Sequence, residues 1–221
     1  MNLLDGVIFD QDGLMFDTKR HAWQPAWRYA LAVYHLPDKP GFGLGCRGLA
    51  GDGMLEHIHN YYGPDVDAEG IVRIANAKAA ELSRRGVPKK KGLDHILAYL
   101  SERGIPMAVA SSNTQETIDF LLESSGIRHY FLAADSGMFI EHPKPAPDIF
   151  LSVARKMGVE PTRTLVLEDS VSGIQAAHAG GFIPVMVPDL MQPPAELRPL
   201  CRAVCKDLDE ARELIDAGEY D

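Results

Sequence analysis

The sequence has few cysteines and no long apolar run, and both absences narrow the class of protein. Cys46, Cys201 and Cys205 form neither an even set nor a CxxC pair, so we expect reduced thiols in a cytoplasmic protein. No stretch reaches the roughly 18 apolar residues of a membrane-spanning helix. The N-terminal segment lacks a basic region and carries Asp5 and Asp10, so no signal peptide is expected.

Positive charge is also scarce, with 22 Lys and Arg against 31 Asp and Glu and a net charge of −9 at pH 7. We therefore expect no nucleic-acid partner and no binding to an anionic membrane surface. The 221 residues are enough to bury a full core and to form one large or two modest domains. Nothing indicates an oligomer, so a monomer is the default expectation.

The segment from residue 16 to residue 90 shows helical spacing and no clear strand. Trp23, Trp27, Leu31 and Tyr34 recur at intervals of three and four residues, which predicts a helix whose aromatic stripe packs in a core. We predict helices over residues 18–34, 54–62 and 68–84, a long Gly- and Pro-rich connection over 37–53, and a solvated linker over 86–92 containing Lys89, Lys90 and Lys91.

The rest of the chain alternates between short apolar runs and amphipathic segments. This order predicts an α/β fold, in which a Rossmann-like parallel sheet is flanked by helices. We expect residues 1–15 and 91–221 to form this core domain and residues 16–90 to form an inserted helical domain. We predict strands over 7–9, 106–110, 131–134, 164–167 and, as the last strand, 183–187, and helices over 93–103, 115–125, 148–157 and 172–179.

Two acids follow the first predicted strand. Asp10 and Asp12 are two residues apart, so their side chains point to the same side of an extended chain. Two carboxylates held this close repel each other unless a cation or a shared proton lies between them. Gly13 permits a positive φ and hence a sharp turn directly afterwards.

Other polar residues follow later strands. Ser111 and Ser112 come after the second strand and Glu168 and Asp169 after the fourth, while Lys144 lies in the loop after the third. Open parallel sheets bind ligands at the carboxyl ends of their strands. Carboxylates suit Mg²⁺, which prefers a few hard oxygens together with water and substrate phosphate. The lysine and the serine hydroxyls suit the remaining phosphate oxygens.

Each of these groups alone also has a purely structural explanation, as a helix cap, a turn or a solvated lysine. A calcium loop that begins at Asp10 would need an acid or amide at its fifth position and Glu at its twelfth, where Leu14 and His21 stand. The combination of the groups, in order and at strand ends, favours a catalytic site.

Four motifs carry a resemblance to a known family. Asp10 to Gly13 read DQDG, Ser111 stands in VASSN, Lys144 in HPKPAPDIF, and Glu168 and Asp169 in LEDSVSGI. In this order the motifs resemble those of the haloacid dehalogenase-like (HAD) phosphohydrolases, over nearly the whole chain. The helical insert is similar to the small α-helical cap domain of the β-phosphoglucomutase-like subgroup.

The resemblance implies roles for these residues. Asp10 would attack phosphorus and become an aspartyl phosphate, and Asp12 would act as general acid and base. The implied Mg²⁺ ligands are Asp10, the backbone carbonyl of Asp12, Asp169 and, directly or through water, Glu168; the implied phosphate ligands are Ser111, Ser112 and Lys144.

The substrate is less well defined. The β-phosphoglucomutase pattern has a threonine eight residues after the nucleophile, as Thr18 is, and a histidine four residues later. Ala22 stands there and His21 is one residue early, which turns a helical side chain by about 100°. We therefore expect a Mg²⁺-dependent phosphatase of a small phosphomonoester, such as a sugar phosphate. The alternatives are a phosphosugar mutase and a non-catalytic binder of phosphorylated metabolites. Candidate substrate residues are Thr18, Arg47 and Asn113, and the role of His21 is open.

Overall fold

The structure is a computed structural model that describes residues 4–46, 49, 51–138, 140–190 and 192–220. Its contacts divide the chain into two compact units, one formed by Met1–Asp17 with Lys89–Asp221 and the other by Thr18–Pro88. Among the described residues, no helix combines the length and the apolar character that a membrane crossing requires.

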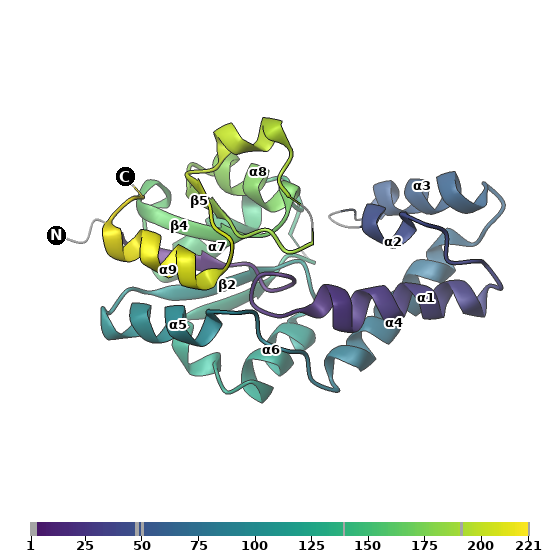
Figure 1. Cartoon of the computed structure of the whole chain (residues 1–221), viewed down its shortest axis with the longest axis horizontal. Helices are drawn as coiled ribbons and strands as arrows, with labels where there is room; N and C mark the ends of the chain where they lie inside the picture. Colours follow the sequence, from purple (N-terminus) through teal and green to yellow (C-terminus); the bar gives the residue numbers. More distant parts are fainter. Residues whose placement is uncertain (1–3, 47–48, 50, 139, 191, 221) are drawn as a thin grey trace. The chain divides into compact units, whose positions relative to one another are not determined.

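The first unit contains a six-stranded sheet in the order β3-β2-β1-β4-β5-β6. Every neighbouring pair is parallel, and the helices flank the sheet (Figure 1). This confirms the predicted α/β fold. The strands are β1 Gly6–Phe9, β2 Met107–Ser111, β3 Ala133–Ser136, β4 Thr164–Glu168, β5 Ile183–Met186 and β6 Ala203–Val204.

The central strands form because their residues are apolar and buried on both faces. All residues of β1, β2 and β4 are buried, as expected for a parallel sheet covered by helices. Ile8 lies beside Ala108 on one side and Val166 on the other. Helices α7 and α8 contact each other and the sheet, while α5 contacts α9. The helices are α5 Leu93–Glu102, α6 Gln115–Ser124, α7 Asp148–Met157, α8 Val171–Ala179 and α9 Leu208–Ala217.

The C-terminal part of this unit differs from the prediction. The strand at 183–187 is not the last, because β6 follows it, and α9 was not predicted. Two residues of strand give too short a pattern to recognise. Helix α9 did have a sequence signal, since Asp207 caps it by accepting a hydrogen bond from the Glu210 N–H at 3.0 Å, and Asp-x-x-Glu is a helix-start pattern.

The second unit is helical. The predicted helix over 18–34 is a π-helical turn followed by α1, and Pro25 is the second residue of α1, directly after that turn. The predicted connection over 37–53 contains α2 and the beginning of α3. The elements are η1 Lys19–Trp23, α1 Gln24–Val33, α2 Phe42–Gly45, α3 Gly51–Tyr62 and α4 Ala68–Ser83.

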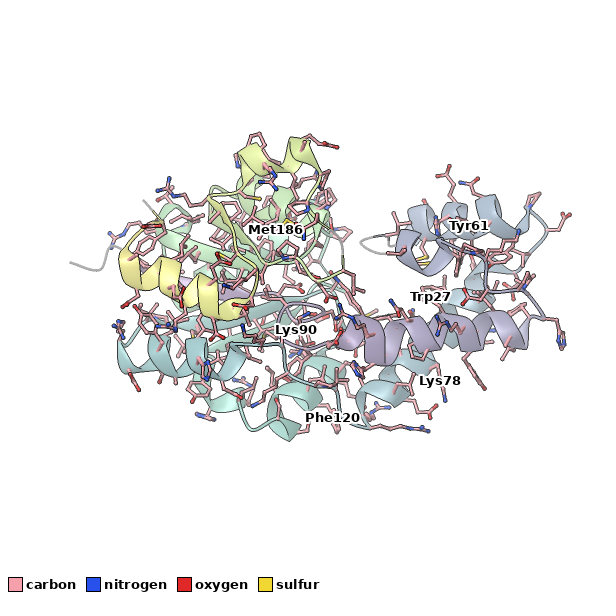
Figure 2. The ribbon with its side chains drawn as sticks, viewed as in Figure 1. Trp27, Tyr61, Lys78, Lys90, Phe120 and Met186 are labelled. Carbon is pink, nitrogen blue, oxygen red and sulfur yellow. The ribbon has the colours of Figure 1, made fainter. Side chains whose placement is uncertain are left out.

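Aromatic side chains form the core of the helical unit. The rings of Trp23 and Trp27 stack at 6.4 Å, and Trp27 meets Phe42 edge to face at 5.9 Å. Phe42 also contacts Tyr61, with the ring centres 5.4 Å apart; Trp27 and Tyr61 are labelled in Figure 2. The predicted packing role of the tryptophan stripe is confirmed.

The predicted solvated linker is wrong for Lys90, whereas the Lys91 side chain is 70% exposed. The backbone N–H of Lys90 donates to the carbonyl of Met15 at 2.8 Å, and the Lys90 side chain is only 22% exposed, against 1% for its partner Asp189. The chain that returns from the helical unit is thereby fixed to the first unit. Three ion pairs of 2.6 Å hold it: Lys89 with Asp94, Lys90 with Asp189 and Lys91 with Asp207.

Candidate active site

The site begins at the turn that ends β1. The Asp10 N–H donates to the carbonyl of Leu167 at 3.0 Å, which continues the pairing with β4. Gly13 has a φ of 94°, and its N–H donates to the carbonyl of Phe16 at 2.8 Å. A side chain at 13 would be strained in this conformation. The turn leaves Asp10 buried at the carboxyl edge of the sheet.

Lys144 connects the ends of three strands. Its Nζ lies 2.7 Å from Oδ1 of Asp10 and 2.8 Å from Oε1 of Glu168, and it donates to the carbonyl of Ala110 at 3.3 Å. The Phe150 ring lies under it, with 4.8 Å from Nζ to the ring centre. The sequence placed Lys144 only in a loop, whereas the structure makes it the cation between two buried carboxylates.

Glu168 is held at the beginning of α8. Its Oε2 accepts hydrogen bonds from the N–H groups of Asp169 and Ser170 at 2.8 and 2.7 Å. Ser170 caps the helix by accepting from the Gly173 N–H at 3.0 Å. The N-terminal end of a helix favours negative charge, so this carboxylate is stabilised on both of its oxygens.

The three charged groups shift one another's pKa values. Burial and the nearby charge of Glu168 raise the pKa of Asp10 well above its usual value, although Lys144 opposes the shift. Burial also disfavours the charge of Glu168, but the Lys144 ammonium and the N–H groups lower its pKa overall. Burial likewise disfavours the lysine charge, yet Asp10 and Glu168 raise the pKa of Lys144. The positive charge of Lys144 therefore does not fully compensate for burial and for the negative charge of Glu168 beside Asp10.

A divalent cation would supply further positive charge. Asp10, Glu168 and Asp169 each offer a carboxylate oxygen, and these atoms lie within 4.8 Å of one another. Within the part of the chain that the structure describes, this is the one group of acids, histidines and cysteines with such a spacing. Three hard oxygen donors fit Mg²⁺.

The end of β2 brings a further group to the site. Ser111 is buried and its Oγ accepts a hydrogen bond from the Asn113 N–H at 3.2 Å, whereas Ser112 is exposed. The side-chain amide of Asn113 donates to Oδ2 of Asp12 at 2.5 Å. Asn113 was expected only as a substrate residue. Its contact with Asp12 had no signal in the sequence.

Of the other expected substrate residues, the structure describes Thr18, which lies in the helical unit. Thr18 is buried and its hydroxyl has no hydrogen-bond partner among the described residues, while Arg47 lies outside them. His21 is exposed and Ala22 is buried. Position 22, where the mutase pattern has its histidine, is therefore buried, whereas the histidine of this chain stands at the exposed position 21.

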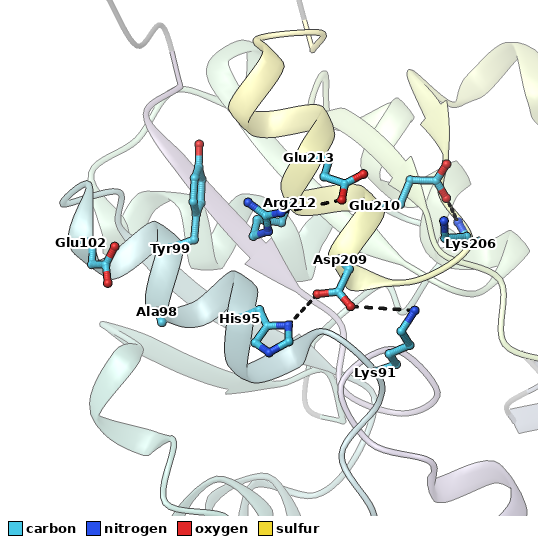
Figure 3. Close-up of a pocket in the computed structure, with 10 residues that line it drawn as sticks. All are labelled: Lys91, His95, Ala98, Tyr99, Glu102, Lys206, Asp209, Glu210, Arg212 and Glu213. Atoms are coloured by element: carbon cyan, nitrogen blue, oxygen red, sulfur yellow. Dashed lines mark hydrogen bonds and ion pairs between the residues drawn. The ribbon is translucent and has the colours of Figure 1, made fainter.

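A surface groove lies between α5 and α9 (Figure 3). Its volume is about 660 Å³, and none of the expected site residues lines it. His95 contacts Asp209 at 2.7 Å and Lys91 contacts it at 3.9 Å, so Asp209 already has partners within the groove.

A parallel sheet whose first strand ends in an acid bound by a buried lysine, beside further acids, is typical of an enzyme that binds an anionic substrate at the carboxyl edge of its sheet. The protein-family model that describes haloacid dehalogenase-like hydrolases matches residues 7–187. The chain belongs to this family, and it is a HAD-like phosphohydrolase.

Named relatives are similar over most of their length. The fructose-1-phosphate phosphatase YqaB of Escherichia coli (strain K12) is 33% identical over 177 residues, which cover 80% of this chain and 93% of that protein. Hexitol phosphatase B of the same organism is 28% identical over 194 residues, 82% of each chain. The crystal structure of a putative β-phosphoglucomutase from Thermotoga maritima shares the fold, with a TM-score of 0.76, 23% identity and coverage of 96% of this chain and 99% of that one.

Proposed function

We propose that the chain is a Mg²⁺-dependent phosphatase that hydrolyses a small phosphomonoester, a sugar phosphate or a similar metabolite, through an aspartyl phosphate. One observation carries the proposal: the buried Lys144 lies between Asp10 and Glu168, beside Asp169, at the carboxyl edge of the sheet. Relatives named as phosphatases of fructose 1-phosphate and of hexitol phosphates support the substrate class.

In the proposed first step, a carboxylate oxygen of Asp10 attacks phosphorus. The bond from phosphorus to the substrate oxygen breaks, and that oxygen leaves with a proton from Asp12. In the second step Asp12 takes a proton from water as the water oxygen attacks phosphorus. The bond between phosphorus and Asp10 breaks, and inorganic phosphate leaves with Asp10 and Asp12 restored.

The remaining residues bind and orient in this proposal. Lys144, Ser111 and Ser112 bind the phosphate oxygens and hold phosphorus in line with Asp10. Asp10, the backbone carbonyl of Asp12, Asp169 and Glu168 would hold Mg²⁺. The ion would neutralise charge on the phosphoryl oxygens.

The test is phosphate release from a panel of phosphorylated metabolites, beginning with fructose 1-phosphate, in Mg²⁺ and in excess EDTA. We expect release only with Mg²⁺, and a loss of at least about 1,000-fold in Asp10→Asn, because that variant has no nucleophile. Turnover retained by Asp10→Asn would contradict the aspartyl phosphate. No release from any ester in the panel would favour the non-catalytic binder.

We also propose that residues 16–90 act as a cap domain that selects the substrate and that the enzyme acts as a monomer. Thr18→Ala and Arg47→Ala should then change KM for the best ester more than kcat. The mutase alternative is tested with β-glucose 1-phosphate and its bisphosphate activator. Glucose 6-phosphate appearing faster than free phosphate would establish the mutase.

A further inference from the structure

The hydrogen bond between Asn113 and Asp12 points to different roles for the two oxygens of the Asp12 carboxylate. The amide Nδ2 of Asn113 lies 2.5 Å from Oδ2 of Asp12. We propose that Asn113 is the positioning residue for the general acid and base: it holds Oδ2, so that Oδ1 carries the transferred proton. The inference rests on the proposed phosphatase reaction and adds a residue to it.

The parallel pairing of β1 and β2 brings the two residues together. Phe9 is in register with Val109, so Asp12 and Asn113 lie at similar distances beyond the ends of neighbouring strands. The two come from loops 101 residues apart in the sequence. Their contact therefore depends on the sheet rather than on any local turn.

Asn113 is itself held by its backbone. Its N–H donates to Oγ of Ser111 at 3.2 Å, and its carbonyl accepts from Oγ of Ser136 at 2.5 Å. Ser136 is fixed in turn, because its N–H donates to Oε1 of Gln115 at 3.1 Å. Gln115 donates through Nε2 to the carbonyl of Ala134 at 2.8 Å. The backbone of Asn113 is thus anchored at the ends of β2 and β3, and this places its side-chain amide.

An amide is suited to this task because it donates a hydrogen bond but does not titrate near neutral pH. A carboxylate oxygen that accepts from the amide N–H is the less basic of the two, because protonation would weaken that hydrogen bond. The proton is therefore directed to Oδ1 of Asp12. The same orientation serves both steps, since the acid of the first step becomes the base of the second.

The dependence on the leaving group tests the proposal. An alkyl phosphate needs a proton on its leaving oxygen, whereas p-nitrophenyl phosphate has a leaving group that departs as an anion. In Asn113→Ala we expect the first-turnover release of alcohol from the best alkyl ester to fall about 10- to 100-fold, part of the usual contribution of a general acid. The first-turnover release of p-nitrophenolate should stay within about threefold of wild type, and KM for the alkyl ester should change little.

Two further variants separate donation from packing. Asn113→Leu has a similar volume but no donor, and it should show the same leaving-group dependence as Asn113→Ala. Ser136→Ala keeps the Asn113 side chain but removes the anchor of its carbonyl, so it should show the same dependence with a smaller loss. Asn76→Ala, at an exposed position of α4, is the matched control and should behave as wild type.

The outcomes distinguish this inference from the proposed function. Equal losses on both esters, or no loss on either, in Asn113→Ala and Asn113→Leu would overturn the positioning role. In that case wild type would still release phosphate, and Asp10→Asn would not. If wild type forms no burst of p-nitrophenolate and releases no phosphate, the phosphatase proposal itself fails.

Discussion

A β-carbon added to Gly173 would lie 1.8 Å from Oε1 of Glu168 and 1.9 Å from its Cδ. The Glu168 carboxylate therefore occupies the space of the missing side chain at the first turn of α8. In Gly173→Ala, the Glu168 carboxylate must move away from Lys144 and from the two backbone N–H groups that donate hydrogen bonds to it. We expect the free energy of unfolding to fall by about 1–3 kcal/mol, as is usual for an overpacked core, and kcat to fall at least about 10-fold. Urea unfolding and phosphate release measure the two effects.

A second glycine provides the control. Gly53 lies in α3, and the nearest atom to an added β-carbon is Cδ2 of Leu49 at 3.9 Å. Gly53→Ala should leave kcat unchanged and raise stability by up to about 1 kcal/mol, because alanine favours the helix. Wild-type stability and activity in Gly173→Ala would show that Glu168 is not confined in this way.

The charge of Asp10 opposes folding in the metal-free protein. Burial and Glu168 raise the pKa of Asp10 above its usual value of 3.8, so the folded state binds this proton more tightly than the unfolded chain. This contribution to stability is present at low pH and is lost as pH rises through the raised pKa. Asp10→Asn has no such charge. We expect it to be more stable than wild type in EDTA at neutral pH, by about 1–2 kcal/mol, with the difference shrinking as the pH approaches 4.

Mg²⁺ should reverse this order. An ion that binds only the folded state stabilises it, and Asp10→Asn removes one carboxylate ligand. Unfolding followed in urea, with Mg²⁺ and with EDTA, should show stabilisation of wild type and little change in the variant. If Asp10→Asn were the less stable protein in EDTA at every pH, the charge of Asp10 would not be unfavourable.

The Lys90 and Asp189 pair should respond unequally to loss of either partner. Asp189 is 1% exposed and Lys90 is 22% exposed. Lys90→Met removes the Lys90 cation from beside a buried carboxylate, and we expect a loss of about 3–5 kcal/mol. Asp189→Asn leaves a lysine that can reach water, so a loss of about 1 kcal/mol is expected.

The neighbouring Lys89 and Asp94 pair is the control, because the two side chains are 29% and 64% exposed. Lys89→Met should change the free energy of unfolding by less than about 1 kcal/mol. Urea unfolding of the three variants at one pH gives the comparison. A loss in Lys90→Met no larger than that in Lys89→Met would contradict the buried character of the pair.

Most of the core fold could be predicted because its signals are local. The apolar residues of β1, β2 and β4 are buried on both faces, so an unbroken apolar run was enough to find them. Helix α7 was predicted at its observed bounds because Gly158, with a φ of 71°, ends it. Of the elements that were missed, α2 and β6 have four residues or fewer, too few for a periodic pattern, whereas α9 has ten residues and was missed despite its helix-start pattern.

The site was predictable at the level of strand ends but not of atoms. The alternation of apolar runs with amphipathic segments, together with the turn residues, predicted that Asp10, Ser111 and Glu168 lie at the carboxyl edge of one sheet. The hydrogen bonds of Asn113 depend instead on side-chain orientations in loops that only the paired strands bring together. The space at Gly173 depends in the same way on the position of Glu168, so no pattern in the sequence could reveal it.

The order of the strands has a consequence for synthesis of the chain on the ribosome. Strand β1 lies at the centre of the sheet, between β2 and β4, yet it is made first. About 155 residues separate its end from the beginning of β4, which corresponds to roughly 8–30 s of translation at 5–20 residues per second. During that time β1 can pair at most with β2, and its β4-facing edge stays unpaired. We therefore expect the nascent chain to need protection of this apolar edge until β4 is made and Asp10 can meet Glu168.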